Sequence, residues 1–351
     1  MNNRFMIYGA TGYTGKLVAK EAKRRGLNPL LSGRNAAKLK EVAEPLGFDY
    51  VAVDLADAAG LDRALSGIDA VVHIAGPFSA TSKPMVDACI RNRKHYLDIT
   101  GEIAVLEALA ARANEAGNAG VMLLPGVGFD VVPSDCLAAH MKRRMPDAVS
   151  LTLAIGGLEK MSRGTAKSSV ESIANPVRVR RDGNIVAVWP PMQRQFDFGK
   201  GPVASIGIGW GDVATAYHST GIPKIEVYFE AIPQIQQMAK LGNFGRWLMS
   251  QPPMQFLLKQ SINFLPEGPS DSERAAGKGI LIGEAVNAAG EKVVSKLRTP
   301  EGYTLTALTS IEIVTRVLAG QAKPGFQTPS RVFGPDFILG FEGCSREDLA
   351  A

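Results

Sequence analysis

Short, nearly continuous apolar runs alternate with amphipathic stretches over the first 124 residues of the chain. Such runs are typical of strands buried on both faces of a parallel sheet, and the amphipathic stretches predict helices. The alternation therefore predicts a doubly wound α/β domain at residues 1–134. Strands are expected at residues 4–8, up to 31, 50–53, 70–74, 95–99 and 120–124, and helices at 16–25, 36–43, 58–65, 83–91 and 103–116.

Beyond residue 134 the pattern changes, and strand-like runs dominate after a helix predicted at residues 135–144. Asp182-Gly183 separates two of these runs, and this pair favours the tight turn of a hairpin. We therefore expect a second, α+β domain at residues 135–302 with a mainly antiparallel sheet. Its strands are expected at residues 150–155, 177–181, 185–188 and 224–231, and a further helix follows at 304–318.

A glycine-rich turn joins the first predicted strand to the first predicted helix. It reads Gly9-Ala10-Thr11-Gly12-Tyr13-Thr14-Gly15. Glycine permits the sharp turn, the approach of phosphates to the backbone and the tight packing of the helix on the strand. The helix N-terminus then directs N–H groups and a positive dipole end toward the phosphates. With a strand before it and a helix after it, the motif predicts the pyrophosphate site of a Rossmann domain.

The end of the second strand predicts which dinucleotide is bound. Ser32, Gly33 and Arg34 follow that strand and face the adenosine ribose in this fold. NAD sites place Asp or Glu there, whereas an arginine attracts the 2′-phosphate of NADP. The stretch holds an arginine and no acid, so NADP(H) is predicted over NAD(H). The alternative is that Arg34 is an ordinary solvated residue before the next helix.

Loops after other strands should complete the site, because ligands of such sheets bind beyond the carboxyl ends of the strands. Asp54 and Leu55 follow the third strand, where a side chain flanks the adenine. The turn at residues 125–130 is expected at the same edge. The remaining predicted cofactor contacts follow the fourth and fifth strands and are Ala75, Gly76, Pro77, Phe78, Thr100 and Gly101.

These motifs resemble those of the saccharopine dehydrogenase-like NADP-binding oxidoreductases. The segments that carry the resemblance are residues 9–15, 32–34, 75–78, 95–102 (His-Tyr-Leu-Asp-Ile-Thr-Gly-Glu) and 125–135 (Pro-Gly-Val-Gly-Phe-Asp-Val-Val-Pro-Ser-Asp). The branch is similar to the one that holds trans-acting enoyl reductases. The resemblance implies an NADPH-dependent reductase of a C=C or C=N bond. It also implies a homodimer, with substrate contacts on the antiparallel sheet, and a segment at about 303–351 that packs back on the first domain.

Composition and charge limit the expected cellular location and classes of partner, but they do not identify a substrate. The chain has 351 residues, is 46% apolar and carries a formal net charge of +5. Its three cysteines and four histidines lack disulfide or metal-ligand spacing, so we expect no metal and a cytoplasmic location. No signal peptide or run of transmembrane length is apparent. The basic clusters accompany no nucleic-acid motif, so a nucleic-acid partner is not expected.

One apolar segment of the second domain, residues 238–265, has two open interpretations. It is rich in Leu, Phe, Met and Trp, and Pro252-Pro253 splits it into two short helices. The first interpretation is a helical pair that closes the core or makes a dimer contact. The second is a lid over an apolar, lipid-like or carrier-bound substrate, or a peripheral membrane contact.

The sequence gives less information about the catalytic residues than about the fold or the cofactor site. No tyrosine is followed four residues later by lysine, which argues against the Tyr-x-x-x-Lys mechanism. Asp130 and His218 are the predicted catalytic residues, chosen from candidates that include Asp98 and Glu102. Each could instead order its own loop. Two other functions stay open, namely a saccharopine-type amino-acid or imine dehydrogenase and a non-catalytic protein that senses NADP(H) or acts as a scaffold.

Overall fold

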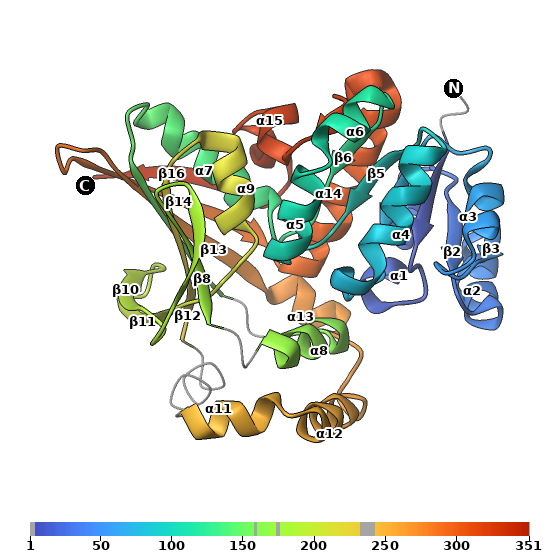
Figure 1. The fold of residues 1–351 in the computed structure, drawn as a ribbon, viewed down its shortest axis with the longest axis horizontal. Coiled ribbons are helices and arrows are strands. Elements are labelled where there is room, and N and C mark those ends of the chain that lie inside the picture. Colours follow the sequence, from blue (N-terminus) through green and yellow to red (C-terminus); the bar gives the residue numbers. More distant parts are fainter. Residues whose placement is uncertain (1–3, 158–159, 173–175, 232–242, 351) are drawn as a thin grey trace. The chain divides into compact units, whose positions relative to one another are not determined.

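The computed structural model describes residues 4–157, 160–172, 176–231 and 243–350 (Figure 1). The chain divides into two compact units. The first unit holds residues 1–136 and 302–341, and the second holds residues 137–301 and 342–351. The last ten residues therefore depart from the expectation that the whole of 303–351 packs on the first domain.

The first unit is built on a parallel sheet of seven strands, in the order β15-β6-β5-β4-β1-β2-β3. β1 and β4 are buried along their whole length, which explains why they are apolar except for His73 at the end of β4. The strands are β1 (Phe5–Tyr8), β2 (Leu30–Gly33), β3 (Tyr50–Ala52), β4 (Ala70–His73), β5 (His95–Asp98), β6 (Met122–Leu124) and β15 (Gly325–Phe326).

Helices flank this sheet, with α3, α4 and α5 packed in a row and α1 packed against α14 (Figure 1). Side chains cap two of them: Asn35 accepts from the Lys38 amide at 3.0 Å, and Asp57 accepts from the Gly60 amide at 2.8 Å. The helices are α1 (Tyr13–Arg24), α2 (Ala36–Ala43), α3 (Ala58–Leu65), α4 (Phe78–Arg91), α5 (Ile103–Ala110), α6 (Ala113–Asn118), α7 (Val132–Arg144, which crosses into the second unit), α14 (Gly302–Arg316) and α15 (Pro329–Phe333).

Five helix predictions were wrong in their bounds, including those at 135–144 and 304–318, whose helices α7 and α14 begin at Val132 and Gly302. α1 begins at Tyr13, directly after the glycine turn, and α4 begins at Phe78. The predicted helix at 103–116 is two helices, because the chain leaves the α-helical pattern between Ala110 and Ala113. The seventh strand, β15, was not predicted, since it has only two residues and pairs with β6 from far along the chain.

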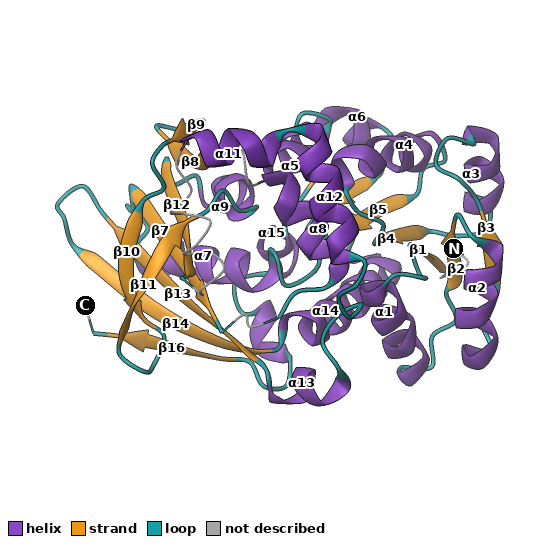
Figure 2. Ribbon diagram, turned by 90° about the horizontal axis from the view of Figure 1, so that it is seen from below, coloured by secondary structure: helices purple, strands orange, loops and turns teal. Residues whose placement is uncertain are grey.

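The second unit is built on a nine-stranded sheet with the path β10-β11-β12-β7-β13-β14-β16, to which β8 and β9 add a hairpin (Figure 2). The predicted hairpin across Asp182-Gly183 is confirmed. Among the described strands of this sheet, every pair is antiparallel except that of β7 with β12. The strands are β7 (Ser150–Gly156), β8 (Val177–Arg181), β9 (Asn184–Val188), β10 (Gln193–Asp197), β11 (Pro202–Gly207), β12 (Lys224–Glu230), β13 (Lys278–Val286), β14 (Lys292–Pro300) and β16 (Ser345–Leu349).

The fold class is confirmed, with a parallel α/β sheet in one unit and a mainly antiparallel sheet in the other. β16 pairs with β14, which explains why residues 342–351 belong to the second unit. Pro252 begins a new helix, so the predicted split of the apolar segment is confirmed, although residues 238–242 lie outside the described residues. The helices are α8 (Arg163–Ser172), α9 (Asp212–Thr220), α11 (Asn243–Ser250), α12 (Pro252–Ile262) and α13 (Asp271–Ala276).

Candidate cofactor site

The register of the parallel sheet brings four strand ends of the first unit to one edge. Tyr8 of β1 is paired with Ser32 of β2 and with His73 of β4, and His73 is paired in turn with Asp98 of β5. The loops that follow these strands therefore leave the sheet side by side. These loops hold most of the predicted cofactor residues, as expected for a doubly wound sheet.

Backbone hydrogen bonds to β2 hold the glycine turn in place, and two of its three glycines are closely packed. The Gly9 and Ala10 amides donate to the Ser32 carbonyl at 2.8 and 3.2 Å. Gly9 has a φ of +92°, and a Cβ on Gly15 would lie 2.2 Å from the Gly9 carbonyl oxygen. At Gly12 the nearest atom to an added Cβ would be 3.5 Å away. Gly12 is exposed and caps α1 without a side-chain hydrogen bond, so its backbone is open to a ligand.

The end of β2 places an exposed guanidinium beside the turn. Arg34 is exposed, and no ion pair joins it to a carboxylate in the part of the chain that the structure describes. Ser32 behaves differently from the expected ligand contact, because its buried hydroxyl donates to the Val51 carbonyl at 2.9 Å. Ser32 therefore holds the turn through its carbonyl, and Arg34 is the side chain available to a 2′-phosphate.

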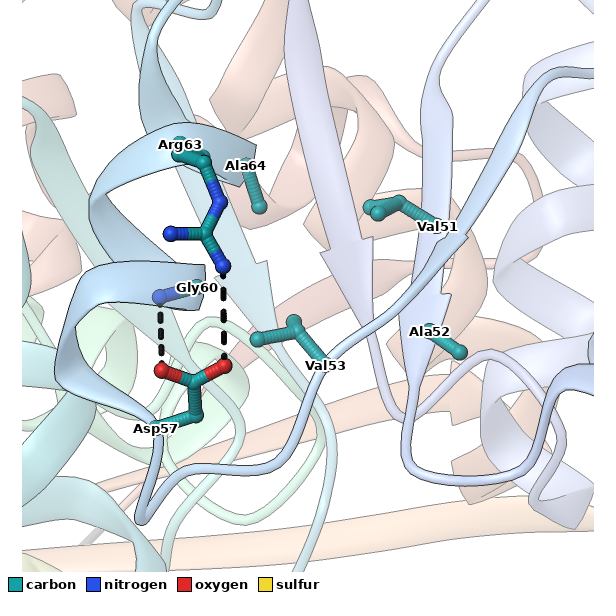
Figure 3. Close-up of a pocket in the computed structure, with 7 residues that line it drawn as sticks. All are labelled: Val51, Ala52, Val53, Asp57, Gly60, Arg63 and Ala64. Atoms are coloured by element: carbon teal, nitrogen blue, oxygen red, sulfur yellow. Dashed lines mark hydrogen bonds and ion pairs between the residues drawn. The ribbon is translucent and has the colours of Figure 1, made fainter.

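Asp54 and Leu55 lie after β3, beside a shallow cavity that none of the predicted site residues lines. The Asp54 carboxylate accepts from the Ala56 amide at 2.9 Å and stays exposed. The cavity has a volume of about 190 Å³ and lies between β3 and α3, where Asp57 pairs with Arg63 at 3.8 Å (Figure 3). Ligand pockets commonly measure about 300–1,000 Å³, so we do not assign a dinucleotide to it.

The loop after β4 is held by a buried histidine and by a carboxylate. The Thr81 hydroxyl donates to the Ala75 carbonyl at 2.6 Å and lies 3.1 Å from His73 Nε2, which donates to it. Burial lowers the pKa of His73 to about 3, so the imidazole is neutral. Glu102 accepts from the Phe78 and Ser79 amides at 2.7 and 2.8 Å. Its carboxylate thus caps α4, which favours a structural role over proton donation.

Asp98 forms the centre of a buried network at the end of β5. Its carboxylate accepts from the Tyr96 hydroxyl at 2.7 Å and from the Thr100 and Gly126 amides at 2.9 and 3.0 Å. Burial raises the pKa of Asp98 to about 6, against the effect of these hydrogen bonds. The Thr100 hydroxyl accepts from the Glu102 amide at 3.1 Å. Asp98 and Thr100 therefore order the loops at this edge.

Asp130 differs from the other carboxylates because it combines partial exposure with a raised pKa. Its side chain lies against Gly101, where an added Cβ would be 3.3 Å from Asp130 Oδ2. Burial raises the pKa of Asp130 to about 7. Such a carboxyl holds a proton near neutral pH at the edge where the predicted cofactor loops meet.

The turn that carries Asp130 is fastened by α14, which the sequence did not link to the site. The Thr306 hydroxyl accepts from the Phe129 amide at 2.9 Å, and Thr309 donates to the Val127 carbonyl at 2.7 Å. The Tyr303 ring of the same helix meets the Tyr13 ring edge-on, with centroids 5.1 Å apart. A helix was predicted at residues 304–318, but no pattern in the sequence connected it to the glycine turn.

His218 lies in the second unit, on α9, whereas Asp130 lies in the first. Its ring is partly buried and meets the Tyr217 ring at a centroid distance of 5.9 Å. His218 stays a predicted catalytic residue. Among the described residues, no group of three or more His, Cys, Asp or Glu side chains is arranged to hold a metal ion. None of the described helices is both long and apolar enough to cross a bilayer.

The predicted cofactor residues of the first unit fall into two groups by exposure. One group is exposed or partly exposed and could contact a ligand: Gly9, Thr11, Gly12, Tyr13, Thr14, Arg34, Asp54, Leu55, Ala75, Gly76, Pro77 and Gly101. The other group is buried and shapes the loops: Ala10, Gly15, Ser32, Gly33, Phe78 and Thr100. An open backbone at Gly12 and an exposed cation at Arg34 fit the pyrophosphate and 2′-phosphate of NADP(H).

Comparisons with known proteins agree with this geometry. Residues 5–124 match the family described as the saccharopine dehydrogenase NADP binding domain. A saccharopine dehydrogenase-like oxidoreductase of Homo sapiens is 28% identical over 211 residues, which cover 53% of this chain and 49% of that protein. A trans-acting enoyl reductase of Mycobacterium ulcerans is 29% identical over 147 residues, 40% of this chain and 35% of that protein. The chain thus spans about half the length, or less, of these two relatives.

A solved structure of saccharopine dehydrogenase (L-Glu forming) from Saccharomyces cerevisiae has the same fold. The TM-score is 0.65 at 12% identity, and the match covers 99% of this chain and 100% of that one. At this identity the likeness shows the fold alone. The family match over residues 5–124 confirms the predicted cofactor, NADP(H). This chain therefore carries a saccharopine dehydrogenase NADP-binding domain at residues 5–124.

Proposed function

We propose that the protein is an NADPH-dependent oxidoreductase that reduces a C=C or C=N bond in an apolar, lipid-like or carrier-bound substrate. The observation that carries the proposal is Asp130, a partly exposed carboxyl with a pKa of about 7 beside Gly101. The similarity to saccharopine dehydrogenase-like oxidoreductases and to a trans-acting enoyl reductase supports the reaction class.

The proposed roles follow from where the residues lie. Bound NADPH would supply a hydride to one carbon of the C=C bond, or to the carbon of the C=N bond. Asp130 would donate a proton to the second atom of the double bond, and its raised pKa keeps a useful fraction protonated near neutral pH. Gly12 and the N-terminus of α1 would hold the pyrophosphate, and Arg34 the 2′-phosphate. His73 and Thr81 position the loop at residues 75–77.

The test is oxidation of NADPH by the purified chain with pools of enoyl, imine and keto substrates. We expect turnover with an apolar enoyl or imine pool and a large loss in Asp130→Asn. Asp49→Asn is a matched control, since Asp49 is an exposed carboxylate of the same unit and pairs with Arg4. Turnover that Asp130→Asn leaves unchanged would remove Asp130 as the donor.

The other two functions give different outcomes in the same screen. Turnover only with amino-acid or dicarboxylate imines would favour a saccharopine-type dehydrogenase. Tight NADPH binding with no turnover in any pool would favour a sensor or scaffold. The homodimer and the cytoplasmic location are part of this proposal as well, and analytical ultracentrifugation and cell fractionation would test them.

A further inference from the structure

Six large apolar side chains of the second unit are exposed within one short stretch of chain. Trp247 and Leu248 lie on α11, Phe256 and Leu257 on α12, and Phe264 and Leu265 directly after α12. Their exposed fractions are 57, 41, 62, 61, 90 and 52%, in that order. We call these six residues the apolar patch. A soluble surface scatters such residues singly, so their clustering points to a surface that binds something.

The helices that present the apolar patch are anchored on their other side. The side-chain amide of Gln255 donates from Nε2 to the carbonyls of Val170 and Met249, both at 2.9 Å. Ile262 of α12 and Val170 of α8 are buried, while Phe256 and Leu257 point outward. Figure 1 shows α11 and α12 end to end, with α8 beside α12. The buried side already serves the fold, so the outward apolar side has no part in the core.

The sequence charge of the segment that contains the apolar patch favours an anionic surface over a second copy of the chain as its partner. Residues 231–266 contain Lys240, Arg246 and Lys259 and no Asp or Glu. The sequence of this stretch therefore has a formal charge of +3, and a two-fold contact between two copies would bring that like charge against itself. An anionic surface would instead attract a stretch of net positive charge. A bilayer interface also takes up Trp, Phe and Leu side chains.

We propose that α11 and α12 lie in the interface of a membrane that contains anionic lipid and hold the protein there reversibly. The helices have 8 and 11 residues and are separated by Gln251, so they suit a position in the membrane plane rather than across it. The apolar patch provides buried area, and the basic segment provides attraction to the headgroups. This inference does not depend on the reaction proposed above.

The test is co-sedimentation of the full chain with vesicles of phosphatidylcholine alone and of phosphatidylcholine with phosphatidylglycerol. We expect binding to the anionic vesicles, weakened by salt, and roughly tenfold or greater loss in the double variant Phe256→Glu/Leu257→Glu. Leu339→Glu is the matched control, because Leu339 is 37% exposed in the first unit, and it should bind as the native chain does. NADPH binding by each variant reports that the chain is folded.

Tryptophan fluorescence gives a second readout of the same contact. Trp247 emission should shift to shorter wavelength with anionic vesicles, and Trp247→Phe should lose that shift. Absence of binding to anionic vesicles, or binding that the double variant retains, would overturn the proposal. So would a double variant that changes the chain from dimer to monomer while vesicle binding stays the same, since the patch would then cover a second copy.

Discussion

Alanine at Gly12 and alanine at Gly15 should separate cofactor binding from folding, although the two glycines belong to one turn. A Cβ at Gly12 would have only the Gly9 carbonyl oxygen nearby, at 3.5 Å, which is ordinary contact. Gly12 also has a φ of −76°, which alanine adopts without strain. We therefore expect Gly12→Ala to change the free energy of unfolding by less than about 1 kcal/mol.

The same Cβ stands where the phosphates must approach the backbone. Losing one charge-assisted hydrogen bond to phosphate costs about 1.5–3 kcal/mol, which is about a 10- to 150-fold weaker dissociation constant for NADPH. At Gly15 a Cβ would lie 2.2 Å from the Gly9 carbonyl oxygen and 2.8 Å from the Ala10 Cα. Backbone has to move there, so Gly15→Ala should lose about 2 kcal/mol of stability even after the gain in helix propensity.

The assays are chemical denaturation for stability and calorimetric titration for NADPH affinity. Gly117→Ala is a matched control, because Gly117 lies in α6 of the same unit and has no atom within 4 Å of an added Cβ. It should bind NADPH as the native chain does. Native affinity in a folded Gly12→Ala protein would refute the assignment of the turn to the pyrophosphate.

Four further predictions concern Arg34, Asp130 and Glu102 of the first unit. Arg34→Asp should abolish or reverse a preference for NADPH over NADH of about 10- to 150-fold, as comparative titrations would show; equal affinity of the native chain for both cofactors would contradict it. If Asp130 is the proton donor that we propose, turnover should fall as the pH rises through about 7, because only the protonated carboxyl can donate, and Asp130→Asn should lower the rate about 10²-fold or more. The pKa of Asp130 is about 7 against an ordinary value of 3.8, so its contribution to stability should fall between about pH 4 and pH 7; a pH series of thermal melts should show Asp130→Asn without that fall. Glu102→Gln should destabilise the fold by about 1–2 kcal/mol through the lost α4 cap, and an unchanged melting temperature would argue against that role.

Much of the candidate cofactor site follows from local signals in the sequence. The glycine turn, the strand before it and the helix after it all lie within residues 5–24, and Arg34 directly follows β2. The parallel sheet then aligns the strand ends without further information. What the sequence could not show is the direction of each side chain. The hydroxyl of Ser32 turns inward because the Val51 carbonyl of the neighbouring strand accepts from it, and that neighbour is set by strand order.

The second unit was harder to predict because several of its strands have no apolar pattern of their own. β10 (Gln193–Asp197) buries only Phe196, and β16 (Ser345–Leu349) buries no residue. These strands form by pairing with β11 and β14. No helix was predicted at α13 either, although its Ser270 and Glu273 form a capping box that is visible in the sequence. A strand without a buried face forms only with its partner, whereas the signal for α13 was local and was missed.

The properties of Asp130 could not be predicted from its neighbours in the sequence. Its place after a glycine-rich turn made it a candidate, yet the same sequence suits a loop-ordering carboxylate. Its raised pKa depends on burial, and the turn is held by Thr306 and Thr309, which lie 177 and 182 residues away from their partners. Asp98 and Glu102 were candidates as well, and the hydrogen bonds that both carboxylates accept from nearby amides favour a structural role for these two residues. Catalytic potential at this edge therefore depends on contacts from α14, and those contacts become visible only when the chain is folded.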